Sequence, residues 1–133
     1  MKPALREFRK PWLWLGIWWF GWALCIVLSL IHPPGLPLDI PDGDKLGHFL
    51  AYATLSAWSV LLFRTGNARI TAALSLVMLG IVLEIGQGYL TQDRLMDARD
   101  ALANGLGVLA GQMLAFSGWQ DLLQRVESRW VRS

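Results

Sequence analysis

The stretch DKLGHFLAYATLSAWSVLLF, residues 44–63, places polar side chains at the start of a segment that is otherwise apolar. Asp44, His48 and Tyr52 follow one another at intervals of four residues, so on a helix a carboxylate, an imidazole and a phenol share one face. Polar and charged side chains inside the hydrocarbon layer cost free energy unless they face the interior of a bundle. The stretch therefore predicts a membrane helix with a polar inner wall.

Three further runs of the chain are equally apolar. Hydrophobic residues make up 54% of the 133 residues and include eight tryptophans, which is more apolar surface than a soluble domain of this size needs. Each run is about long enough to cross a hydrocarbon core of roughly 30 Å. We therefore expect an all-α fold: a polytopic integral membrane four-helix bundle that forms one domain over residues 1–133. The predicted helices cover residues 11–31, 46–63, 70–90 and 99–118.

The first apolar run could also be a signal peptide, because the basic segment MKPALREFRK precedes it. The run is long, holds five tryptophans and is followed by IHPPGLP rather than by a small-residue cleavage pattern, so we interpret it as a retained anchor. The single cysteine, Cys25, leaves neither a disulfide framework nor a thiolate metal site.

Basic residues predict the orientation of the bundle. They gather before the first helix, between the second and third, and after the fourth: Lys2, Arg6, Arg9, Lys10, Arg64, Arg69, Arg125, Arg129 and Arg132. The other two connections hold only Lys45, Arg94 and Arg99, set among six aspartates. Because basic segments stay on the cytoplasmic side, both termini are expected to be cytoplasmic. The predicted location is the bacterial cytoplasmic (inner) membrane.

The C-terminal stretch, residues 119–133, predicts a short amphipathic helix that lies on the inner membrane surface. At helical spacing its apolar side chains line one side, and its arginines lie largely elsewhere: Trp119, Leu122, Leu123, Val126 and Trp130. A solvated, frayed tail is the alternative.

Polar side chains of the second, third and fourth helices are expected to meet near the outer surface. At 1.5 Å per residue, all of them lie within about three turns of that surface. The members of this expected cluster are His48, Tyr52, Glu84, Gln87, Asp100 and Asn104. Glu84 stands out, because a carboxylate in the apolar layer needs a partner and the C-terminal end of a helix disfavours an anion. A structural ion pair with Arg94, Lys45 or His48 is the alternative to a functional role.

Four other residues near these helix ends and faces are expected to have structural roles. Asp44 is placed to stabilise the start of the second helix, and Asp97 the start of the fourth. The sequence Gly107-x-x-x-Gly111 is typical of helices that approach a neighbour closely.

In order along the chain, these residues resemble the VanZ-like membrane proteins, a family associated with resistance to the glycopeptide teicoplanin. The resemblance runs from about residue 29 to residue 111. Its motifs are Asp44, Lys45, His48 and Phe49; Glu84 and Gln87; Arg94; and Asp100, Asn104, Gly107 and Gly111. It implies a short four-helix member of the family. It assigns no reaction, and whether the chain is an enzyme stays open.

The function we expect is binding or processing of an amphiphilic envelope lipid or a lipid-linked cell-wall precursor, with a link to glycopeptide tolerance. The candidate catalytic residues are His48, Glu84 and Asp100, and the candidate substrate-binding residues are Lys45, Tyr52, Gln87, Arg94 and Asn104. Lys45 and Arg94 suit an anionic head group, and His48 suits general acid–base work. The alternatives are a structural or partner-binding membrane protein, or a small proton-coupled transporter.

We expect no cofactor. The sequence has no zinc pattern, because its only other histidine, His32, is remote. The alternative is a Mg²⁺ or Ca²⁺ ion held by hard oxygen donors: Glu84, Asp97, Asp100 and Asn104. Membrane lipids or a lipid-linked precursor are the expected partners, with no nucleic acid, and a homo-oligomer stays open.

Overall fold

The computed structural model describes residues 4–31, 43–90 and 97–130. The elements are α1 (Pro11–Leu30), α2 (Gly43–Leu62), α3 (Gly66–Leu90), α4 (Ala98–Gln112), the 3₁₀ turn η1 (Met113–Phe116) and α5 (Leu122–Trp130). Within these ranges there is no named strand, only an isolated bridge between Leu5 and Phe63. The predicted all-α fold is confirmed.

Three helix boundaries differ from the prediction by more than one residue. α2 begins at Gly43 and α3 at Gly66, three and four residues before the predicted starts. The prediction followed hydrophobicity, whereas the first turn of a helix accepts polar residues such as Asp44. The predicted fourth helix, residues 99–118, ends as an α-helix at Gln112 and tightens into η1, which is a common way for a helix to end.

Two helices, α1 and α3, are long and apolar enough to cross a membrane. Only 22% and 28% of their apolar windows are buried inside the protein, so neither resembles the core helix of a soluble domain. Side chains such as Phe20 and Leu74 are more than half exposed, as lipid-facing residues are. Within the described part of the chain α2 and α4 do not meet the same test. The polar residues of α2 lower its mean hydropathy, and α4, with 15 residues, is shorter than the 18 residues required. Four membrane crossings therefore stay a prediction.

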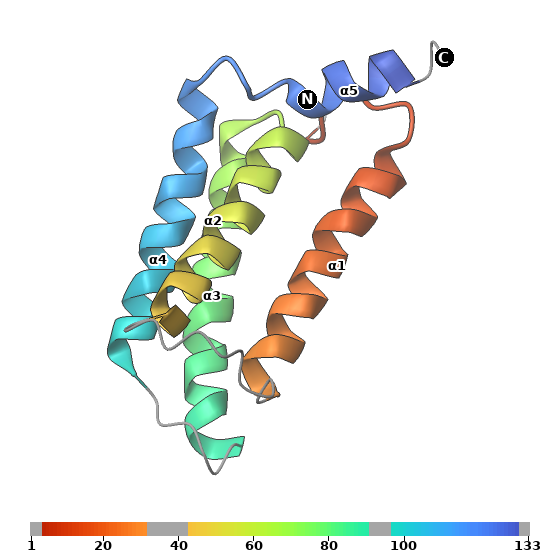
Figure 1. The fold of residues 1–133 in the computed structure, drawn as a ribbon. Helices are drawn as coiled ribbons and strands as arrows, with labels where there is room; N and C mark the ends of the chain where they lie inside the picture. The colour runs from red at the N-terminus through yellow and green to blue at the C-terminus, as the bar shows by residue number, and fades with distance from the viewer. Residues whose placement is uncertain (1–3, 32–42, 91–96, 131–133) are drawn as a thin grey trace.

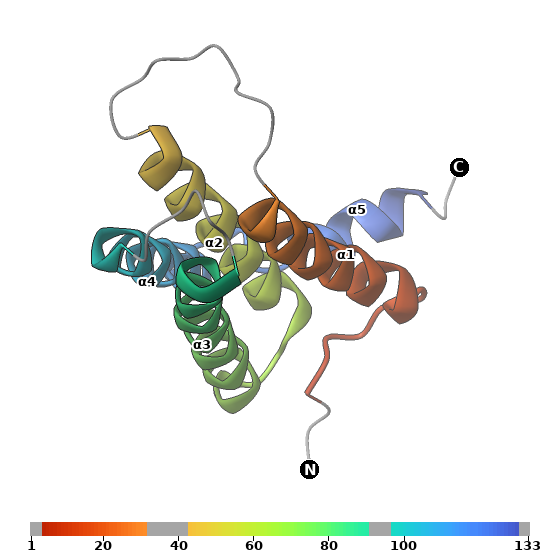
Figure 2. The ribbon, with the colours of Figure 1, turned by 90° about the horizontal axis from the view of Figure 1, so that it is seen from below.

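The four long helices lie side by side, and α5 runs across one end of them (Figure 1; Figure 2 shows the same arrangement from below). α2 and α4 make the most extensive contact. A Cβ atom built on Gly107 would stand 2.4 Å from the Phe49 carbonyl oxygen, and one on Gly111 would stand 2.4 Å from that of Ala53. Only glycine allows the two backbones to come so close, as the sequence predicted for this pair.

The N-terminal segment, the α2–α3 turn and α5 meet at one end of the bundle (Figure 1). Arg6 N donates to the Leu62 carbonyl at 2.9 Å, and the Arg6 guanidinium pairs with Asp121 beside α5. The described basic residues of this end come from three segments that the sequence analysis placed on one side of the membrane. The structure therefore brings these basic residues together at one end of the bundle.

α5 is amphipathic, and its buried residues are one leucine and one glutamate. Leu123 and Glu127 are buried, whereas Val126 and Trp130 are exposed by 43% and 63%. The carboxylate of Glu127 accepts hydrogen bonds from Arg9 N (2.7 Å), Lys10 N (2.9 Å) and Trp14 Nε1 (3.0 Å). α5 is thus tied to the start of α1 by a buried acid.

Candidate functional site

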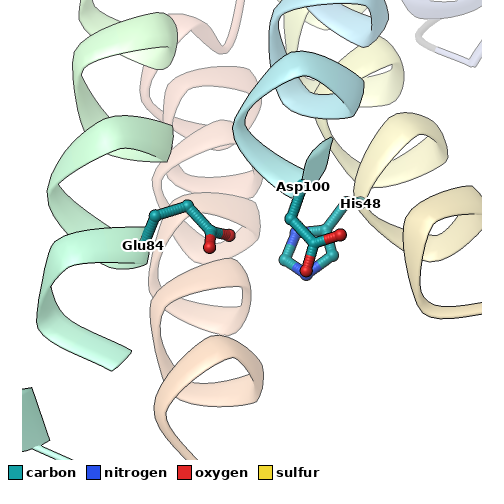
Figure 3. A group of neighbouring side chains, drawn as sticks. All are labelled: His48, Glu84 and Asp100. Carbon is teal, nitrogen blue, oxygen red and sulfur yellow. The ribbon is translucent and has the colours of Figure 1, made fainter. Parts of the chain in front are cut away.

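Three ionisable side chains from three helices converge at the end of the bundle opposite α5. His48 comes from the second turn of α2, Glu84 from the last third of α3 and Asp100 from the first turn of α4. Each offers one ligand atom, and these atoms lie within 4.8 Å of one another. Figure 3 shows the Glu84 carboxylate pointing toward Asp100 and the His48 ring. The structure thus brings together the three residues expected to be catalytic.

The His48 ring is held by Asn104, one turn along α4 from Asp100. His48 Nδ1 lies 3.1 Å from Asn104 Oδ1. Because an amide oxygen only accepts hydrogen bonds, this pairing puts the proton on Nδ1. Nε2 then carries the lone pair in a neutral ring, and it lies 3.9 Å from Asp100 Oδ2, beyond hydrogen-bond distance.

Lys45 lies at the outer edge of the site, with its side chain 25% exposed. Its ammonium is 3.7 Å from Asp97 Oδ2 and 3.8 Å from Asp100 Oδ1. Asp97 is the N-cap of α4, and its side chain accepts from Arg99 N at 2.8 Å. This backbone hydrogen bond, helped by the charge of Lys45, lowers the pKa of Asp97, which therefore stays an anion. The predicted capping role of Asp97 is confirmed.

Glu84 is the least compensated group of the site. Only 3% of its surface is exposed, and neither of its carboxylate oxygens has a hydrogen-bond partner among the residues that the structure describes. The backbone of Asp97 lies nearby, outside hydrogen-bond geometry. Asp100 Oδ1 and the Tyr52 hydroxyl are also buried without a hydrogen bond. Each such group costs free energy, so this region is not arranged for stability alone.

Other expected members lie beside the cluster or outside the described residues. Gln87 donates to the Ser29 carbonyl at 2.8 Å, so its amide ties α3 to α1. Tyr52 is 1% exposed and lies one turn deeper, where it and Asn104 pack against Gly80 of α3. Asp44 stands in the first turn of α2, as predicted. Arg94 falls in residues 91–96, which the structure does not describe.

A second polar group, which the sequence analysis missed, joins α2 to α4 further along the bundle. Ser56 Oγ donates to the Val108 carbonyl at 2.7 Å. Gln112 Nε2 donates to Ser56 Oγ at 2.9 Å and to Ser59 Oγ at 3.2 Å. The signal was present, because Ser56 continues the four-residue spacing of His48 and Tyr52. Each of these hydroxyl and amide groups has a hydrogen-bond partner, so their role is to hold α2 against α4.

Comparison with protein-family models, with curated proteins and with solved structures finds no match to this chain. The possible chemistry of the site is therefore inferred from its side chains. It offers an imidazole held through Nδ1, two buried carboxylates and a partly exposed ammonium. Such a set can bind a polar or charged head group, hold a cation, or move a proton.

Proposed function

We propose that this chain is a VanZ-like protein of the bacterial cytoplasmic membrane that binds or processes the head group of an amphiphilic envelope lipid. Four helices cross the membrane, with both termini in the cytoplasm and α5 on the inner surface. The length and exposed apolar surface of α1 and α3 support membrane insertion. The basic end of the bundle supports the orientation, which leaves the His48–Glu84–Asp100 cluster near the outer leaflet.

The observation that carries the proposal is the buried, unpartnered carboxylate of Glu84. A structural network gains stability by pairing its members, because an unpaired buried charge is strongly destabilising. Glu84 has His48 and Asp100 as neighbours and no hydrogen bond from either. Binding sites often hold buried polar side chains without a partner until the ligand binds, and this lowers the stability of the free protein.

Lys45 and His48 define what the head group can be. The Lys45 ammonium stands beside Asp97 and Asp100, and its side chain is 25% exposed, so a phosphate oxygen can approach it. His48, oriented by Asn104, is the group suited to accept or donate a proton at the ligand. A phosphate-bearing lipid or lipid-linked precursor fits this pair.

Lipid that remains bound during purification tests the proposal. We expect the parent protein, purified in a mild detergent, to retain a phosphate-bearing lipid class that mass spectrometry identifies in the extract. Glu84→Gln and Lys45→Gln should lose most of it. Asp44→Asn is the matched control, because Asp44 is an exposed acid one residue from Lys45, and it should retain the lipid. The same lipid profile in all four proteins would contradict the proposal.

A further inference from the structure

We propose that His48, Glu84 and Asp100 bind one divalent transition-metal ion, of the class of Zn²⁺ or Mn²⁺. The ligands are His48 Nε2 and one carboxylate oxygen from each acid. The proposal concerns the same end of the bundle as the lipid proposal, but it does not require that a lipid binds there. It goes beyond the sequence analysis, which expected no cofactor.

The distances match three ligands around a single ion. Two ligands that each lie about 2.0–2.2 Å from a metal are at most about 4.4 Å apart. The three ligand atoms lie within 4.8 Å of one another, and His48 Nε2 is 3.9 Å from Asp100 Oδ2. That last separation is too long for a hydrogen bond and suits two ligands of one ion. Binding of one ion would require small side-chain rotations that bring the ligand atoms closer together.

His48 is already prepared as a ligand. A histidine that binds a metal through one nitrogen usually donates the proton of its other nitrogen to an oxygen, which fixes the tautomer and the ring orientation. Asn104 Oδ1 provides that oxygen for Nδ1 at 3.1 Å. The other nitrogen, Nε2, lies 3.9 Å from Asp100 Oδ2, and Figure 3 shows the ring beside Asp100.

Glu84 supplies the second, independent indication of a ligand. It is more than nine-tenths buried, its oxygens have no hydrogen-bond partner in the described part of the chain, and its carboxylate points into the cluster. Among the described residues, the carboxylates of Glu84, Asp97 and Asp100 gather here with the Lys45 ammonium and the exposed Arg99. These carboxylates outnumber the two cations, which favours binding of a further cation.

The donor set differs from the oxygen set that the sequence suggested for Mg²⁺ or Ca²⁺. Asp97 caps α4 and pairs with Lys45, and the Asn104 oxygen is used by His48. The two carboxylate oxygens of Asp100 have different neighbours: Oδ1 lies near the Lys45 ammonium and Oδ2 near the His48 ring. The ligand set therefore consists of one imidazole and two carboxylates. Imidazole ligands favour transition-metal ions over Mg²⁺ and Ca²⁺.

Titration of the chelator-treated protein in detergent with ZnCl₂, and separately with MnCl₂, tests the site. We expect one ion per chain by calorimetry, and loss of at least about 10-fold in affinity for Glu84→Gln, Asp100→Asn and His48→Ala. Asn104→Leu should weaken binding without abolishing it. Asp44→Asn and His32→Ala remove an exposed acid and the other histidine, and both should bind like the parent. Size-exclusion profiles and melting curves in chelator establish that each variant is folded.

The outcomes are separable from those of the lipid test. No binding of either ion to the parent at millimolar concentration, or equal binding by the parent and Glu84→Gln, would overturn the metal site. If lipid is nevertheless retained and lost in Glu84→Gln, the acids bind the head group directly. Stoichiometric metal binding that the three ligand variants abolish, with no lipid retained, would support the metal site and overturn the lipid proposal.

Discussion

Gly107 of α4 lies against Phe49 of α2 so closely that a Cβ on the glycine would stand 2.4 Å from the phenylalanine carbonyl oxygen. This contact fixes the register of the two helices. Phe49 follows His48, and Gly107 lies one turn after Asn104, so the same register places the imidazole against the amide oxygen at 3.1 Å. The geometry of the site therefore depends on two backbones that meet without side chains between them.

Alanine at Gly107 or Gly111 should separate α2 from α4. The new methyl group meets backbone atoms at 2.4 Å, which cannot rotate away, and we expect each change to cost about 1–3 kcal/mol of stability. Melting curves in detergent measure the loss. Gly105→Ala is the matched control: the same helix, the same substitution and nothing within 4 Å of the new Cβ. It should be neutral or stabilising, and an equal loss in all three would show that the close packing is not the cause.

The sequence predicted that four long helices exist and which polar residues face inward, because both follow from periodicity. Periodicity does not say which neighbour a face meets. Glu84 and Gln87 are three residues apart on α3, about 60° around the helix. That difference is enough for Glu84 to point toward α2 and α4 while Gln87 bonds to Ser29 of α1.

The buried acid of α5 escaped prediction for a related reason. Residues 119–133 place apolar side chains along one side at helical spacing, and this pattern predicts a membrane-facing side but no buried acid. Glu127 is buried because three donors at the start of α1 converge on it. Those donors lie more than 110 residues earlier in the chain, and no local pattern connects them.

Neighbouring tryptophans of α1 should respond differently to replacement by leucine. Trp18 is 5% exposed, donates from Nε1 to the Leu55 carbonyl at 3.0 Å and packs edge-on against Phe63. Trp19 is 57% exposed. We expect Trp18→Leu to cost about 2–3 kcal/mol and Trp19→Leu to leave the melting temperature within about a degree or two of the parent's. Equal effects would contradict the packing of α1 against α2.

Reporter fusions test the orientation on which the outer-leaflet site depends. Fusions after Asp42 and after Gln92 should report an exterior location, since nine of the twelve basic residues lie in the termini and in or next to the connection between α2 and α3. A fusion after Ser133 should report the cytoplasm. A cytoplasmic signal from either of the first two would mean that α2 and α4 do not both cross, and the four-helix topology would be wrong.

The contact between α5 and α1 should weaken in acid. Burial raises the pKa of Glu127, but the hydrogen bonds from Arg9 N, Lys10 N and Trp14 Nε1 outweigh it and lower the pKa below its ordinary value. A lowered folded-state pKa contributes stability above the unfolded value, and that stability is lost as the pH falls through the folded one. The parent should therefore lose more melting temperature below about pH 4.3, the ordinary glutamate value, than Glu127→Gln. Parallel pH profiles would contradict this.

The two buried glutamates of the chain should respond in opposite ways to the same substitution. Glu127→Gln weakens three hydrogen bonds to a charged acceptor, at about 1.5–3 kcal/mol for each such bond that is lost, so its melting temperature should fall. Glu84→Gln removes a charge that no hydrogen bond compensates. In chelator it should melt at or above the temperature of the parent, and in cells it should lose any envelope phenotype that the parent confers. If Glu84→Gln instead melts as early as Glu127→Gln, the carboxylate is part of a stabilising network, and the site at His48, Glu84 and Asp100 should be abandoned.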